Sequence, residues 1–319
     1  MKKRLLIDTD PGVDDALAIY LALGSPDAEL VGLTTSFGNA DITTVTRNAR
    51  YILDTVDSHS LEVYRGSSEP LSQAAIASVV HGVNALGRVE IPAVMRDKYD
   101  SVSAVGDSAD GYSALLDANA PGARVVVVLG PLTNLARFLA QHKNRLERCD
   151  RLVVLGGTLS APGNKGPVAE FNFRCDPEAA DYVLANCPCE ITLVPLDLCM
   201  RSAVPVQDLN KVENQAFRRF LHLLCDEYAV ANNDEEGLEG IIMYDPLAVF
   251  CALRPEHFVY ERFWMRVDTG NSFARGMSVV DRRLRSDLAR NVSIATNVNW
   301  DAFVDLFFTA LNRIPFKNP

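Results

Sequence analysis

Short apolar runs alternate along the chain with segments in which apolar residues recur at helical spacing. The runs predict buried strands at residues 5–7, 29–35, 61–64, 124–129, 151–155 and 190–196. The segments with helical spacing predict helices at 41–56, 108–119, 135–146, 206–231 and 300–311. This order of strands and helices predicts an α/β fold, with a mainly parallel central sheet flanked by helices.

Other stretches are less regular. Residues 72–98 carry loop signals, and 158–174 form a loop long enough to suggest a functional role. A polar, acidic connection is expected at 232–240, followed by a helix capped by Asp245, while 258–280 alternates as half-buried strands do. The chain contains neither an internal repeat nor a shift in composition, so we expect one domain over residues 1–319.

The composition narrows the class of protein. A formal net charge of -10 argues against nucleic acid or an anionic membrane surface as a partner. The apolar run after Lys2-Lys3-Arg4 is too short for a signal peptide, and no run is long enough to span a membrane. Seven cysteines without a C-x-x-C pair suggest reduced thiols in a cytoplasmic protein, and the close pair Cys187-Pro188-Cys189 is taken as incidental.

An acidic turn follows the first strand. Asp8 and Asp10 are two apart and would share a face of that strand, while Asp14 and Asp15 fall in the first turn of the next helix. A single aspartate here would most simply cap the helix. Four carboxylates around Pro11-Gly12 repel one another unless a cation offsets their charge, and clustered oxygen ligands suit Ca²⁺ or Mg²⁺. We therefore expect a metal site at the carboxyl end of this strand.

The acidic turn and several later motifs, in this order, resemble the inosine-uridine-type nucleoside hydrolases over nearly the whole chain. The motifs are Asp8-Thr9-Asp10-Pro11-Gly12-Val13-Asp14-Asp15, Gly130-Pro131-Leu132-Thr133-Asn134-Leu135-Ala136, Gly156-Gly157 with Asn164, Ala169-Glu170-Phe171-Asn172, Asp176-Pro177-Glu178-Ala179-Ala180, Asp245-Pro246-Leu247-Ala248 and Gly276-Met277-Ser278-Val279-Val280-Asp281.

The resemblance implies an enzyme that hydrolyses the N-glycosidic bond of a ribonucleoside, as a homodimer or homotetramer. It implies one Ca²⁺, with Asp10 also acting as general base on a Ca²⁺-bound water. The implied ligands are Asp10, Asp15, Asp245 and the backbone carbonyl of Leu129. The implied ribose-binding residues are Asp14, Asn39, Asn164, Glu170 and Asn172.

The residue before Asp245 departs from the family pattern. Members of the inosine-uridine type commonly have a histidine there, proposed as the acid that protonates the leaving base, whereas this chain has Tyr244. An unperturbed tyrosine is a poor acid at neutral pH, but its ring can stack on a nucleobase. We interpret Tyr244 as a base contact, with packing beside the helix as the alternative. His81 resembles a position near the base, and the base preference is expected to depend on the segments around His81 and 226–244.

Two other functions remain open at this point. Asp8-x-Asp10 with Gly106-Asp107 is similar to the acidic motifs of haloacid-dehalogenase-type phosphatases, although Pro11 stands where those enzymes have Thr or Val. Alternatively, the loss of the histidine at Tyr244 would suit a ribonucleoside-binding or sensing protein. The retained Asp10 argues for catalysis, because binding alone needs no general base.

Overall fold

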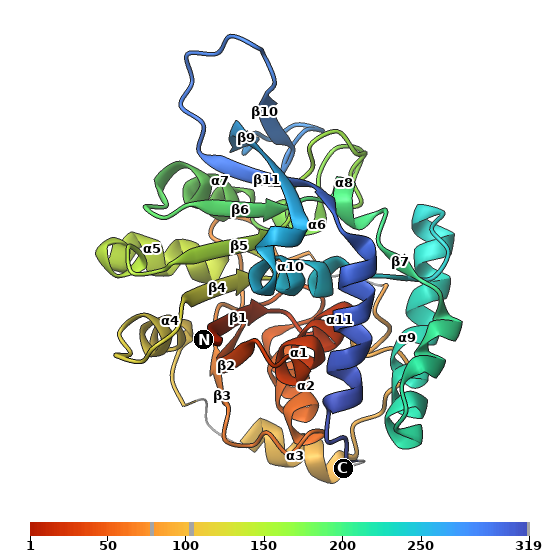
Figure 1. Ribbon diagram of the computed structural model, residues 1–319. Helices are drawn as coiled ribbons and strands as arrows, with labels where there is room; N and C mark the ends of the chain where they lie inside the picture. Colours follow the sequence, from red (N-terminus) through yellow and green to blue (C-terminus); the bar gives the residue numbers. More distant parts are fainter. Residues whose placement is uncertain (77–79, 102–104, 318–319) are drawn as a thin grey trace.

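A nine-stranded sheet forms the centre of the computed structural model, which describes residues 1–76, 80–101 and 105–317 (Figure 1). Its strand order is β10-β9-β11-β6-β5-β4-β1-β2-β3. The parallel strands are β1 (Lys3–Thr9), β2 (Ala28–Thr35), β3 (Glu62–Arg65), β4 (Arg124–Val128), β5 (Arg151–Leu155), β6 (Ile191–Val194) and β11 (Val292–Val298). At one edge, β9 (Phe258–Val267) pairs antiparallel with β11, and β10 (Ser278–Asp281) pairs antiparallel with β9. The expected α/β fold with a mainly parallel sheet is confirmed.

Alternating side chains of the central strands supply two cores, one on each face of the sheet. Leu5 and Ile7 enter one core, and Leu6 enters the other. Helices on the first face are α1 (Val13–Gly24), α2 (Ile42–Asp54), α9 (Gln215–Glu236), α10 (Tyr244–Leu253) and α11 (Trp300–Arg313). Helices on the second face are α4 (Ser108–Leu116), α5 (Thr133–Leu146) and α7 (Pro177–Asn186). Figure 1 shows the two layers on either side of the sheet.

Smaller elements connect this framework. They are α3 (Ala93–Ser101), α6 (Phe171–Cys175), α8 (Leu196–Cys199), the 3₁₀ helices η1 (Val206–Lys211) and η2 (Pro255–His257), and a two-stranded sheet of β7 (Ala203–Val204) and β8 (Ile241–Ile242). Of the stretch 72–98, residues 77–79 lie outside the described residues, and α3 begins within its last part.

Three details differ from the pattern read in the sequence. Strand β11 was not predicted, although it lies inside the sheet between β9 and β6. Helix α9 continues through the polar residues 232–236 and ends at Gly237, whose positive φ of 67° suits glycine. Asp245 lies in the first turn of α10, and the cap position is occupied by Met243.

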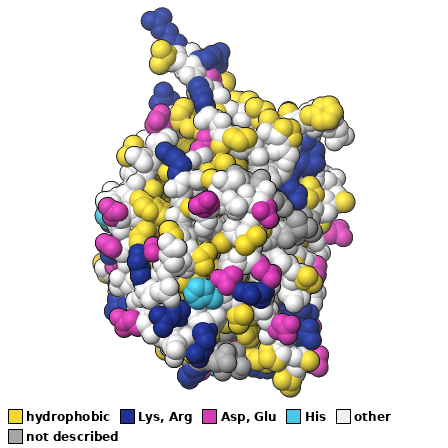
Figure 2. Space-filling view, turned by 90° about the vertical axis from the view of Figure 1, so that its right-hand side faces the viewer, with side chains coloured by type: hydrophobic (Ala, Val, Ile, Leu, Met, Phe, Trp, Pro, Cys, Tyr) yellow, Lys and Arg dark blue, Asp and Glu magenta, His cyan; other side chains and the backbone are white. Residues whose placement is uncertain are grey.

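The surface carries charges of both signs. On the face shown in Figure 2, acidic and basic side chains are interspersed. Within residues 1–76, 80–101 and 105–317, every helix is too short or too polar to cross a membrane.

Candidate active site

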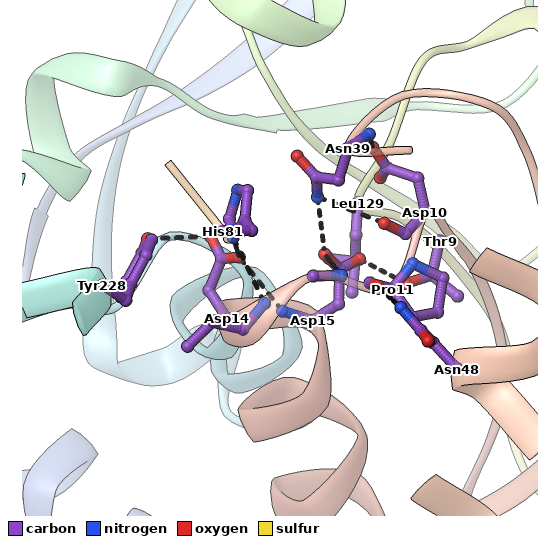
Figure 3. Close-up of polar contacts among 12 residues, drawn as sticks. Thr9, Asp10, Pro11, Asp14, Asp15, Asn39, Asn48, His81, Leu129 and Tyr228 are labelled. Carbon is purple, nitrogen blue, oxygen red and sulfur yellow. Dashed lines mark hydrogen bonds and ion pairs between the residues drawn. The ribbon is translucent and has the colours of Figure 1, made fainter. Parts of the chain in front are cut away.

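The turn between β1 and α1 is held by the Asp15 carboxylate. Its Oδ2 accepts the N–H of Gly12, the N-cap residue, at 2.9 Å, and its Oδ1 accepts the Thr9 hydroxyl. The amide of Asn39 donates to the same Oδ2 at 3.1 Å (Figure 3). Asp15 is therefore fully buried and fixed at the start of α1, as its place in the motif predicts.

Asp10 lies beside Asp15 at the end of β1. Its Oδ2 accepts the backbone N–H of Asn39 at 2.7 Å, and its backbone carbonyl accepts the Asn39 amide at 3.1 Å. Gly130, after β4, approaches so closely that a Cβ there would lie 2.4 Å from Asp10 Oδ1. Burial, and then the charge of Asp15, raise the pKa of Asp10 well above its ordinary value. Neighbouring groups thus fix the position of the Asp10 carboxylate, while burial and the charge of Asp15 disfavour its ionised form.

A carboxylate cluster forms where the first turns of α1 and α10 meet. Asp14, Asp15 and Asp245 are buried, and each offers a ligand atom within 4.8 Å of the others. Burial and the neighbouring carboxylates raise the pKa of Asp14 and of Asp245 well above the ordinary range. Helix N-termini favour negative charge, which accounts for part of the stability of this arrangement. Hard oxygen donors with excess negative charge fit a cation such as Ca²⁺ or Mg²⁺.

Asp8 does not belong to this cluster. Its carboxylate accepts the Tyr112 hydroxyl at 2.5 Å and the Asn134 amide at 2.9 Å, on the opposite face of the sheet from Ile7. Burial raises the pKa of Asp8 to about 6. Asp8 and Asp10 were expected to share a face of one strand, but β1 ends at Thr9, so Asp10 belongs to the turn that follows it. Asp8 ties the sheet to α4 and α5.

A cavity that is open to solvent lies above the cluster. Every residue expected to act in catalysis, substrate binding or metal binding lines it except Asp15, which is fully buried. The lining residues from that set are Asp10, Asp14, Asn39, His81, Leu129, Asn164, Glu170, Asn172, Tyr244 and Asp245.

One wall of the cavity comes from the end of the 158–174 loop. Glu170 caps α6, and its carboxylate accepts backbone N–H groups of Asn172 at 2.8 Å and Gly157 at 2.9 Å. Burial nevertheless raises the pKa of Glu170 to about 7. The Asn172 amide donates to the Leu129 carbonyl at 2.5 Å, which leaves that oxygen a second lone pair. Asn164 accepts the Phe171 N–H at 2.9 Å and so fixes the loop against α6.

Another part of the cavity lining contains a stacked pair of rings. His81 stacks on Tyr228 of α9 with centroids 5.2 Å apart, and the Tyr228 hydroxyl donates to Asp14 at 3.3 Å (Figure 3). Nδ1 of His81 accepts the Val13 N–H at 3.2 Å. Burial lowers the pKa of His81 to about 4, so the ring is neutral and carries its hydrogen on Nε2. His81 therefore presents one N–H donor at the cavity.

Some lining residues were not singled out from the sequence. Tyr228 and Asn232 lie one helical turn apart on α9, within the segment 226–244 that was expected to influence base preference. Phe171 and Lys165 line the wall beside Glu170. An aromatic residue at helical spacing is typical of a core position, so Tyr228 had no distinguishing signal in the sequence. Tyr244 lines the cavity and also packs against the core.

Comparison with known proteins gives a consistent result. A family model described as inosine-uridine preferring nucleoside hydrolase matches residues 5–305. The pyrimidine-specific ribonucleoside hydrolase RihA of Photobacterium profundum is 35% identical, over 96% of this chain and 97% of that protein. The inosine-uridine preferring nucleoside hydrolase of Leishmania major is 32% identical, over 98% and 99%. A solved purine-preferring ribonucleoside hydrolase from Gardnerella vaginalis superimposes with a TM-score of 0.86 at 28% identity, over 98% and 99% of the two chains.

Proposed function

Since the chain belongs to the family of inosine-uridine preferring nucleoside hydrolases, which are enzymes acting on N-glycosyl compounds, we propose that it is a Ca²⁺-dependent hydrolase. It cleaves the N-glycosidic bond of a ribonucleoside to free base and ribose in the cavity described above. The single observation that carries the proposal is the convergence of the carboxylate cluster with a ring of amide and carboxylate side chains in one cavity. The family match also leaves the phosphatase alternative without support, and Asp107 serves as the N-cap of α4.

In this proposal, Ca²⁺ is held by Asp10, Asp15, Asp245 and the Leu129 carbonyl. Asp10, Leu129 and Asp245 line the cavity, and Asp14 is close enough to Asp15 and Asp245 to share the charge. The bound ion would lower the pKa of a water molecule and fix its position. The uncompensated charge of the buried carboxylates supports this assignment, because a divalent cation offsets it.

Asp10 acts as the general base in the proposed reaction. Its carboxylate accepts a proton from the attacking water, and the Asn39 N–H holds the carboxylate in place at 2.7 Å. The close approach of Gly130 restricts the carboxylate further. A base held this firmly loses little orientational freedom during the reaction.

The remaining side chains orient the ribose and the base. Asn39, Asp14, Asn164, Glu170 and Asn172 surround the space where the ribose hydroxyls would bind, and hydrogen bonds there position the sugar and stabilise its oxocarbenium-like transition state. Glu170 and Asn172 are well suited because backbone contacts already fix their side chains.

We assign the base to the side of the cavity formed by aromatic rings. Tyr244 would contact the base by stacking, and neutral His81 would donate through Nε2. The Tyr228 ring holds His81 in this orientation, since the two rings stack at an interplanar angle of 20°. Neither an aromatic face nor one N–H donor selects a purine over a pyrimidine, so both classes belong in the first assay.

The test is ribose release from a panel of purine and pyrimidine ribonucleosides, measured with and without a chelator. We expect release that stops on chelation and returns when Ca²⁺ is added. Release that survives complete metal removal would contradict the metal assignment. A protein that binds Ca²⁺ and ribonucleosides but releases no ribose from any of them would instead support a binding or sensing role.

A further inference from the structure

Two thiols lie in contact at the start of strand β6. Cys187 follows the last residue of α7, and its N–H donates to Val183 at 3.0 Å. Pro188 separates it from Cys189, and the Sγ atoms of the two cysteines are 3.3 Å apart. The fixed φ of the intervening proline limits the conformations in which the thiols could separate. The two sulfur atoms are therefore held within reach of each other.

Exposure distinguishes this pair from the other cysteines. All seven cysteines are free thiols, and five of them are buried, whereas Cys187 and Cys189 are partly exposed. The pair precedes β6, while the cavity residues Leu196 and Cys199 follow the other end of that strand. The two thiols thus lie near the amino ends of the parallel strands, whereas the cavity lies at their carboxyl ends. The proposed hydrolysis does not use these thiols.

The surroundings give the two thiols different reactivity. The hydrogen bond from Cys189 lowers the pKa of Cys187, and the charge of Lys143 adds to this effect. Hydrogen bonding with Cys149, and then with Cys187, raises the pKa of Cys189. Cys149 lies behind the pair, with its Sγ 3.0 Å from the Arg151 carbonyl. Because the thiolate is the reactive form, Cys187 is the nucleophile and Cys189 its partner.

We propose that Cys187 and Cys189 form a redox-active dithiol, which small disulfides of the glutathione class convert reversibly to an intramolecular disulfide. The Cys187 thiolate attacks one sulfur of glutathione disulfide, and its S–S bond breaks to release one glutathione thiolate. Cys189 then gives its proton to the released glutathione thiolate and attacks the Cys187 sulfur, and the second glutathione leaves as a thiolate that takes a proton from water. Two protein thiols are oxidised and one glutathione disulfide is reduced to two thiols.

The experiment exposes the full-length native protein to glutathione disulfide, blocks the remaining thiols and maps the peptides by mass spectrometry. We expect the peptide containing residues 187–189 to lose two hydrogens and to resist blocking, and reduced glutathione to reverse both changes. Cys187→Ser and Cys189→Ser should abolish the bond. Cys149→Ser, the matched control in the same cluster, should retain it.

Three results of the peptide map would overturn the proposal. They are a 187–189 peptide that stays fully reduced, a mixed glutathione disulfide that persists on either thiol, and a bond joining Cys149 to Cys189. Loss of the bond in a folded Cys149→Ser protein would also contradict it. If that variant does not fold, the peptide map of the parent protein still decides which sulfurs are joined.

Discussion

Replacing Glu170 by glutamine should change how the stability of the metal-free protein depends on pH. Burial raises the pKa of the Glu170 carboxyl from 4.5 to about 7, although it accepts N–H groups from Gly157, Asn172 and Phe173. A raised pKa means that folding favours the neutral acid. The resulting contribution to the free energy of unfolding is fully present below pH 4.5 and is lost as pH rises to about 7.

The size of this effect follows from the two pKa values. They differ by about 2.5 pH units, and each unit corresponds to roughly 1.4 kcal/mol, so the contribution is about 3 kcal/mol. Glutamine stays neutral throughout. The free energy of unfolding of the parent minus that of Glu170→Gln should therefore fall by about 3 kcal/mol between pH 4.5 and pH 7, and then level off.

The assay is denaturant unfolding in the presence of chelator at a series of pH values, followed by the fluorescence of Trp264 and Trp300. Glu178→Gln is the matched control. Partial burial raises the pKa of Glu178, but the hydrogen bond from Arg275 at 2.8 Å, further hydrogen bonds from the Glu178 backbone and Ser72, and the charge of Arg275 together hold that pKa below its usual value. The parent-minus-variant difference for Glu178 should therefore rise only below pH 4.5 and stay level between pH 4.5 and pH 7. A flat or rising difference for Glu170 would refute the reasoning, because the three N–H donors would then outweigh burial.

The remaining predictions concern catalysis and are measured by steady-state ribose release. Asp10→Asn should lower kcat by about 10²–10⁴, as loss of a general base does, and a kcat near that of the parent would exclude this role. Tyr244→Phe should keep the base contact and a KM near that of the parent. Tyr244→Ala should raise KM about 5- to 150-fold, equivalent to roughly 1–3 kcal/mol of stacking. Equal KM values for the two variants would favour a packing role. Gly130→Ala places a Cβ 2.4 Å from Asp10 Oδ1 and should lower kcat, with melting temperature as the control for folding.

The sequence predicted the elements whose patterns reflect burial on both faces of the sheet. The valine-rich run became β4 because every one of its central side chains is buried. Strand β11 was missed because its polar residues Ser293, Thr296 and Asn297 interrupt the apolar pattern, although β6 and β9 flank it. The polar end of α9 was missed for a related reason, since residues 232–236 show no apolar periodicity in the sequence although the helix continues through them.

The candidate site likewise contains residues that a sequence motif identifies and residues that only the fold brings together. Asp10 and Asn39 meet in the cavity because they follow β1 and β2, which end at the same side of the sheet, and Glu170 joins them as the N-cap of α6. Tyr228 comes from a long helix without a motif, and only the fold brings it against His81. The position of Asp8 depended on where β1 ends, which the alternation of residues could not determine.

The acidic cluster also explains why the ends of two helices meet at the site. Asp14 and Asp15 start α1 and Asp245 starts α10, so the positive ends of both helix dipoles face the same carboxylates. The Asp15 carboxylate accepts hydrogen bonds from the Gly12 N–H, the Thr9 hydroxyl and the Asn39 amide. Burial nevertheless raises the pKa of Asp14 and Asp245. The fold thus offsets only part of the repulsion it creates. A bound cation would offset the remaining repulsion, and cation binding should therefore stabilise this edge of the sheet.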